Sequence, residues 1–125
     1  MSYFKKFLII TLFITPIQSF SDEKIEQSKS FVENLGKQVV EKVSNMNLSE
    51  NERNVNFRKL YLNSFDNYYI SRFVLGRYWK KLDSNMRKQF INSFNDYIVA
   101  TYAPKFKGWE GTFKAVDSLI ENNYY

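Results

Sequence analysis

The sequence predicts an α+β fold dominated by helices, in which amphipathic helices pack on a small, incomplete antiparallel sheet. Two observations support this prediction. Between residues 22 and 102, apolar residues recur mostly at three- and four-residue steps, the spacing of amphipathic helices. After Pro104 the spacing changes to two residues, which is typical of a strand. A chain of 125 residues is long enough for one small domain.

The first residues predict export. Two lysines precede an apolar run over residues 7–14, and small residues follow at Ser19 and Ser21. This is the pattern of a cleavable secretory signal peptide, and the run is shorter than the roughly 20 residues that span a bilayer. We therefore expect residues 1–21 to be a signal peptide and residues 22–125 to be the mature domain, with no permanent membrane anchor. An uncleaved anchor is the alternative.

Two helices are predicted in the first half of the mature chain. An apolar stripe over residues 22–46 indicates the first of them. Gly36 lies inside this helix and either weakens it or allows a neighbouring element to cross closely. Ser49 and Glu52 have the spacing of a capping box, so a second helix is expected from Glu50 towards Phe65.

Two more helices and one strand complete the predicted elements. Asp66 is expected to cap the third helix, and Gly76 to end it in a left-handed conformation. The fourth helix is expected to begin at Asp83 or Ser84 and to end before Pro104. Residues 112–117 then alternate in polarity, which indicates one strand. A lone strand leaves both edges unpaired, so we expect either a short hairpin or a sheet that is cut short.

The composition argues against several functions. The chain has no cysteine and no histidine, which excludes disulfides and thiolate catalysis and removes the commonest general base. No spacing singles out carboxylates, lysines or tyrosines, so we expect no enzyme activity, no metal site and no cofactor. Loss of Lys5 and Lys6 with the signal peptide lowers the net charge from +5 to +3. This mild excess does not indicate a nucleic-acid partner.

Aromatic residues are unusually frequent, with twelve Phe, nine Tyr and two Trp. Such residues at helical spacing are ordinarily core. Their number exceeds what a small four-helix domain easily buries, however, and Tyr and Trp suit the mouth of a lipid cavity. Candidate lipid-binding residues are Phe73, Val74, Tyr78, Trp79, Phe90, Phe94, Tyr97, Ile98 and Tyr102. Arg72 and Arg77 form either a solvated basic face or a rim that binds phosphate headgroups.

The stretch "FDNYYISRFVLGRYWKKLDSNMRKQFINSFNDYIVATYAPKF" resembles a known family. It is similar to the central signature of the Mla-type periplasmic phospholipid-binding proteins, the MlaC or toluene-tolerance family. The matching positions are Phe65-Asp66, Ile70-Ser71-Arg72, Val74-Leu75-Gly76-Arg77, Trp79, Phe90, Phe94 and Tyr102. The resemblance covers most of residues 22–111, and the signal peptide and the first amphipathic helix fit it as well.

The resemblance implies a fold and a function. The fold packs helices against a twisted antiparallel sheet, with acyl chains between the two layers. The function is periplasmic carriage of phospholipid between an outer-membrane lipoprotein complex and an inner-membrane ABC transporter with an MCE-domain component, a system that maintains outer-membrane lipid asymmetry. Family members continue with further strands beyond the point where this sequence stops. We therefore expect a lipid-carrier-like domain truncated at its C-terminal end, either as a gene product, as a fragment or as a domain that borrows strands.

Another class of function fits the same residues. A helical protein-interaction module would use an exposed apolar face to bind a partner protein, and a non-functional fragment would expose the same face. Phospholipid that co-purifies with the protein would favour the carrier over these alternatives.

Overall fold

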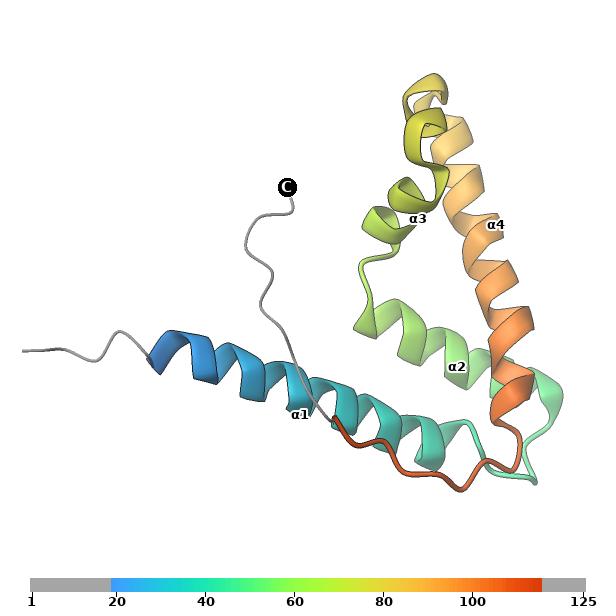
Figure 1. Cartoon of the computed structure of the whole chain (residues 1–125). Helices are drawn as coiled ribbons and strands as arrows, with labels where there is room; N and C mark the ends of the chain where they lie inside the picture. The colour runs from blue at the N-terminus through green and yellow to red at the C-terminus, as the bar shows by residue number, and fades with distance from the viewer. Residues whose placement is uncertain (1–18, 116–125) are drawn as a thin grey trace, which may run out of the picture.

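The computed structural model describes residues 19–115, and these fold into four α-helices and two short 3₁₀ helices (Figure 1). The predicted signal peptide lies almost entirely outside the described residues, as do residues 116–125. The α-helices are α1 (Ser19–Lys42), α2 (Glu50–Ser64), α3 (Asn67–Leu75) and α4 (Ser84–Tyr102), and the 3₁₀ helices are η1 (Gly76–Lys81) and η2 (Ala103–Phe106).

The helices form two limbs that meet at an angle (Figure 1). In the base, α1 packs on α2, and α2 also contacts η2 and α4. In the second limb, α3 and the first part of α4 pack side by side and project away from the base; we call this limb the arm. The end of the arm is η1 with the first turn of α4, which we call the tip. The segment over residues 107–115 returns along α1 (Figure 1).

The main core lies in the base, between α1 and α2. Val39, Val43 and Leu60 are buried there, with Leu35, Phe57 and Phe106 packed against them. The arm has a smaller buried centre, in which Trp79 and Ser71 are enclosed. The arm is only two helices thick, so most of its large apolar side chains keep one side in water.

A buried arginine joins α1 to α2. Arg53, at the start of α2, is only 3% exposed, and its guanidinium donates to the carbonyl oxygens of Val43 (3.0 Å) and Asn45 (2.7 Å). Asn56 donates to the carbonyl oxygen of Lys42 at 2.9 Å. Carbonyl groups at the end of a helix lack partners within it and carry partial negative charge, so a cation is stabilising there. These contacts end α1 at Lys42, four residues before the predicted end at residue 46.

The predicted starts of the other helices are confirmed. Ser49 and Glu52 form the capping box: the Ser49 hydroxyl accepts from the Glu52 amide, and the Ser49 amide donates to the Glu52 carboxylate. Hydrogen bonds from the Ser49 hydroxyl and amide lower the pKa of Glu52 below its usual value. Asp66 caps α3 and Asp83 caps α4, each by accepting a backbone N–H at 2.8 Å.

The predicted sheet is wrong for the described part of the chain, where no strand occurs. Residues 111–115 have no regular structure, and residues 116–117 of the predicted strand lie outside the described range. The returning segment is held to α1 and the turn after it by single bonds, from the Gly108 amide to the Ser44 carbonyl (2.7 Å) and from the Ala115 amide to the Glu33 carboxylate (3.3 Å). A segment that lies across a helix can alternate in polarity as an edge strand does, and this explains the misleading pattern.

Gly76 ends α3 as predicted, and its conformation provides a test of backbone strain. Its φ and ψ are +52° and −125°, a region that side chains with a Cβ rarely adopt. A Cβ there would meet no atom within 4 Å, so strain would come from the backbone alone. We expect Gly76→Ala to lower the free energy of unfolding by about 1–3 kcal/mol, measured by urea denaturation. The control Asn85→Ala, at an exposed site in α4, should change it by less than about 0.5 kcal/mol. Equal stability of the two variants would show that a side chain at residue 76 does not strain the backbone.

Candidate functional site

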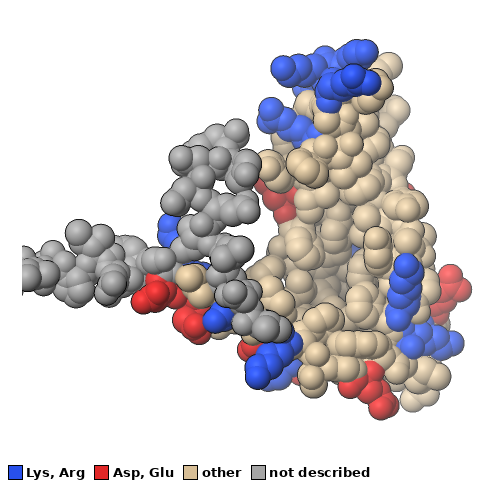
Figure 2. Space-filling view, in the orientation of Figure 1, with Lys and Arg blue, Asp and Glu red and all other residues tan. Residues whose placement is uncertain are grey.

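An apolar groove opens where the two limbs meet. Its volume is about 260 Å³, and residues from α1, α2, the end of α4, η2 and the returning segment line it. The lining residues are Val32, Leu35, Gly36, Val39, Phe57, Leu60, Tyr61, Phe65, Tyr102, Phe106 and Phe113. None of them carries a charge. Figure 2 shows a broad face without Lys, Arg, Asp or Glu on this side of the molecule, with the charged residues at its margins.

A chain of aromatic contacts follows the groove from α1, along α2, to the returning segment. On α2, Phe57 stacks on Tyr61 with ring centroids 6.4 Å apart, and Tyr61 contacts Phe65 at 5.8 Å. The chain continues at both ends, through Phe31–Phe65 on one side and through Phe57–Phe106, Phe106–Trp109 and Trp109–Phe113 on the other. Five of these seven rings, all except Phe31 and Trp109, line the groove and supply rigid apolar walls at little cost in side-chain entropy.

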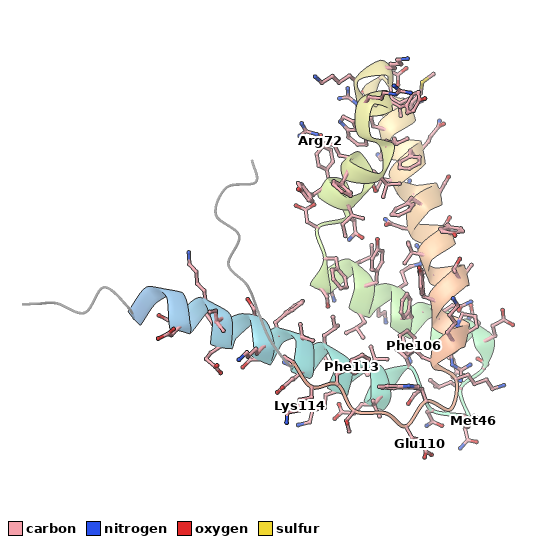
Figure 3. The ribbon with its side chains drawn as sticks, viewed as in Figure 1. Met46, Arg72, Phe106, Glu110, Phe113 and Lys114 are labelled. Carbon is pink, nitrogen blue, oxygen red and sulfur yellow. The ribbon has the colours of Figure 1, made fainter. Side chains whose placement is uncertain are left out.

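Gly36 allows the returning segment to close one side of the groove. The Phe113 ring lies directly on the α1 backbone, so that a Cβ built on Gly36 would come within 2.0 Å of it. Figure 3 shows Phe113 over α1, next to Phe106. Of the two interpretations of Gly36, the structure supports the close crossing, and the element that crosses is the segment around Phe113.

Tyr61 contributes a hydroxyl to this apolar surface. Its side chain is 8% exposed, and the hydroxyl oxygen makes no hydrogen bond within residues 19–115. Burial raises the pKa of Tyr61 above its usual value, because the charged phenolate would lose its hydration. The phenol is therefore neutral at physiological pH, and the groove presents no charged group to a ligand.

The structure separates the predicted lipid-binding residues into four groups. Tyr102 lines the groove. Phe73, Val74, Tyr78 and Tyr97 are exposed on the arm, whereas Phe90, Phe94 and Ile98 are partly buried in it. Trp79 is enclosed in the tip, where its ring lies against Tyr68 and Arg87. Arg72 and Arg77 are exposed on the arm, away from the groove (Figure 3 labels Arg72). For the residues outside the groove, lipid binding stays a prediction.

The arm buries a different face of its helices from the one that apolar spacing indicates. In α3 the buried residue is Ser71, while Phe73 is 76% exposed. In α4 the buried residues are Asn95 and Val99, while Tyr97 is 60% exposed. α3 contacts α4 and η1, while α4 contacts α3, α2 and η2, and the sides that face these neighbours are buried whatever their composition.

Most groove residues lie outside the predicted set. They come from α1, α2 and the chain after Pro104, whereas the predicted lipid contacts lie on α3, η1 and α4. One signal does point to them: Phe57, Tyr61 and Phe65 recur at intervals of four and form an aromatic ridge on one side of α2. That ridge was expected to be ordinary core, but Phe65 is 43% exposed.

Other kinds of site were sought over the same residues. Between residues 19 and 115, no group of three or more acidic side chains is placed to hold a metal ion. No helix in this part of the chain is both long and apolar enough to span a bilayer.

Comparison with known proteins identifies the family. The family model described as "MlaC protein" matches residues 33–123, which include α2, α3, α4 and the returning segment. Searches of curated proteins and of solved structures each gave no match. The matched region contains ten of the eleven residues that line the groove, all except Val32. The chain belongs to the MlaC family, whose members are periplasmic phospholipid-binding transport proteins.

Proposed function

We propose that this protein is a periplasmic phospholipid carrier and that the groove between the limbs holds an acyl chain. In this proposal residues 1–21 direct export. The carrier exchanges lipid with an outer-membrane lipoprotein complex and with an inner-membrane ABC transporter that has an MCE-domain component. It makes and breaks no covalent bond.

The observation that carries the proposal is the composition of the groove. Eleven residues line it, none is charged, and aromatic contacts run along its length. Transfer of apolar surface out of water is favourable by roughly 25 cal/mol per Å², and an acyl chain offers only such surface. A polar or charged ligand would lose hydration in this groove without gaining a partner.

The size of the groove limits what it holds. Its volume of about 260 Å³ is just below the roughly 300–1,000 Å³ of sites that enclose drug-sized ligands. The groove alone therefore suits part of one acyl chain, with the rest of the lipid on the adjoining apolar face of the arm. Tyr97 and Phe73 are exposed on the arm and are our candidates for this contact. Arg72 is our candidate for the headgroup phosphate, since its planar fork can bind two oxygens.

Filling the groove tests the proposal. We expect Val32→Trp to reduce the amount of phospholipid that co-purifies with the full chain by roughly ten-fold, because the indole ring would occupy the space of the acyl chain. Native mass spectrometry of protein purified from the periplasm measures the bound lipid. Val32 lines the groove and is 45% exposed, so the larger side chain has room and the fold should be kept.

Val55→Trp is the matched control. Val55 is 42% exposed on α2 and does not line the groove, so this variant adds the same ring at similar exposure. It should retain lipid as the unmodified protein does. Undiminished lipid in Val32→Trp would show that the groove is not the binding site, and a wild-type protein without any lipid would contradict carriage altogether.

A protein-interaction module is the second candidate, and the exposed apolar side chains of the arm favour it. Phe73, Tyr69 and Tyr97 are each more than half exposed. If they contact a partner protein instead of lipid, a lipid-free chain should self-associate in sedimentation experiments and bind a hydrophobic dye. Addition of phospholipid should then leave the dye bound, whereas a lipid carrier should release it.

A further inference from the structure

The positive charge of the chain is concentrated at one end of the arm. Residues 72–88 hold six of the 18 Lys and Arg residues but only one of the 13 acidic residues, which leaves twelve of each sign in the rest of the chain. The net charge of +5 is thus the net charge of this stretch. Figure 2 shows the corresponding basic side chains gathered at the projecting end of the molecule. They are Arg72, Arg77, Lys80, Lys81, Arg87 and Lys88.

The single acid of this stretch does not neutralise these cations. The Asp83 carboxylate accepts the Met86 amide at 2.8 Å and caps α4. Within residues 19–115 the ion pairs are Lys29–Glu26 and Arg58–Asp96, and neither lies at the tip. Arg87 has a structural role, because it donates to the Trp79 carbonyl oxygen (3.2 Å) and covers the Trp79 ring. The other five cations are exposed.

Apolar groups lie among the exposed cations. Tyr78 is 50% exposed, and its ring has the Arg77 guanidinium 5.2 Å from its centroid and the Lys81 ammonium 5.3 Å from it. Val74 and Met86 are also about half exposed. An aromatic ring between two cations suits the headgroup layer of a membrane, where the ring enters the apolar boundary while the cations bind phosphate.

We propose that the tip docks this protein on the surface of a bilayer that contains anionic phospholipid, with Arg77, Lys80 and Lys81 on the phosphates and Tyr78 in the headgroup layer. The proposal rests on the lipid-carrier function, since it places the carrier on the surface of a membrane in which one of its partner complexes lies. A bilayer fits better than an acidic protein, because no hydrogen bond fixes Lys80, Lys81 or Lys88 within the described residues. Flexible cations around a projecting end can all reach a fluid layer of phosphates at once.

The length of α4 separates this contact from the groove. The helix begins at the tip and ends at Tyr102, which lines the groove. Its 19 residues span about 28 Å at a rise of about 1.5 Å per residue. Docking at the tip therefore leaves the groove open, and variants at the tip should not affect lipid already held there.

Co-sedimentation of the purified full chain with vesicles tests this proposal. We expect binding to vesicles of phosphatidylcholine and phosphatidylglycerol in equal parts and little binding to phosphatidylcholine alone. The double variant Lys80→Gln, Lys81→Gln should bind the anionic vesicles roughly 30-fold more weakly, since each lysine near an anionic surface contributes a factor of roughly five. Both side chains are exposed, so the fold should be kept. Binding by the wild type should also fall steeply as salt is added.

The control Lys59→Gln, Lys107→Gln removes two exposed lysines away from the tip and has the same net charge. It should bind anionic vesicles as the wild type does. An equal loss in this control would overturn the proposal, because net charge and not the tip would then drive binding. If the wild type binds both kinds of vesicle equally, the proposal is overturned as well. It is also overturned if the wild type binds no vesicles, which is the result expected if the tip binds an acidic protein. Lipid in the groove, measured by native mass spectrometry, should stay unchanged in both variants, so this test is independent of the one for carriage.

Discussion

Replacing Trp79 with alanine is expected to lower the free energy of unfolding by about 3 kcal/mol, the low end of the range for a buried tryptophan. Trp79 is 5% exposed and is the largest buried side chain of the arm. Its ring packs edge-on against Tyr68 at 5.2 Å and under the Arg87 guanidinium at 5.1 Å. Because the arm is two helices thick, it can collapse partly around the cavity that the substitution leaves. The loss in free energy of unfolding should therefore be at the low end of the range. Urea denaturation followed by circular dichroism measures the effect.

Tyr78→Ala is the matched control for Trp79→Ala. Tyr78 is the preceding residue in η1, carries a ring of similar size and is 50% exposed. Its loss should change the free energy of unfolding by less than about 1 kcal/mol. Trp79→Phe should restore most of the stability while removing the indole. If Trp79→Ala is as stable as Tyr78→Ala, then Trp79 does not stabilise the arm. That result would favour its predicted role in lipid binding.

Arg53→Met should be destabilising by about 3 kcal/mol, although it removes no ion pair within the described residues. The variant keeps a long apolar side chain but loses the guanidinium, which leaves the carbonyl oxygens of Val43 and Asn45 without these donors. Val43 is fully buried, so water cannot easily replace the donor at its carbonyl. Because Arg53 joins the two helices that form the groove, the variant should also retain less phospholipid. Denaturation and native mass spectrometry of the same preparation measure the two effects.

Arg58→Met provides the comparison on the same helix. Arg58 is partly exposed and pairs with Asp96 on α4, an ion pair at the surface. Such pairs contribute roughly 0–1 kcal/mol, so this variant should be destabilised by less than about 1 kcal/mol. A similar loss in both variants would mean that the bonds from Arg53 to the end of α1 add little to the stability of the base.

The residues that cap the helices can be predicted from the sequence, because each cap forms hydrogen bonds to residues only three or four positions away. Ser49 with Glu52, Asp66 and Gly76 are each predicted at the cap at which they lie, and the start of α4 is predicted at Asp83 or Ser84, of which Asp83 is the cap. The first helix was assigned an end four residues too late. Its end depends on Arg53, whose bonds to α1 span eight and ten residues and leave no local pattern.

The lipid contacts were predicted less well than the helices. Apolar spacing indicates which side of a helix can be buried, but α3 and α4 each have more than one side with enough apolar residues to be buried. In the folded chain α3 packs on α4, and α4 packs on α2 and η2 as well, so Ser71 and Asn95 are buried while Phe73 and Tyr97 are exposed. Of the nine predicted contacts, Tyr102 alone lines the groove, because it lies at the end of α4 that reaches the base.

The sequence by itself determined that there are four helices in residues 22–102, how α2, α3 and α4 begin and, through the stretch around "VLGRYW", the resemblance to the MlaC family. Only the tertiary structure decided where the groove lies, which aromatic rings surround it and that the segment through Phe113 crosses α1 without forming a strand. The physical reason is the range of the interactions. Caps and helical periodicity act within one turn, whereas the groove depends on the angle between two limbs, which contacts between residues far apart in the chain determine.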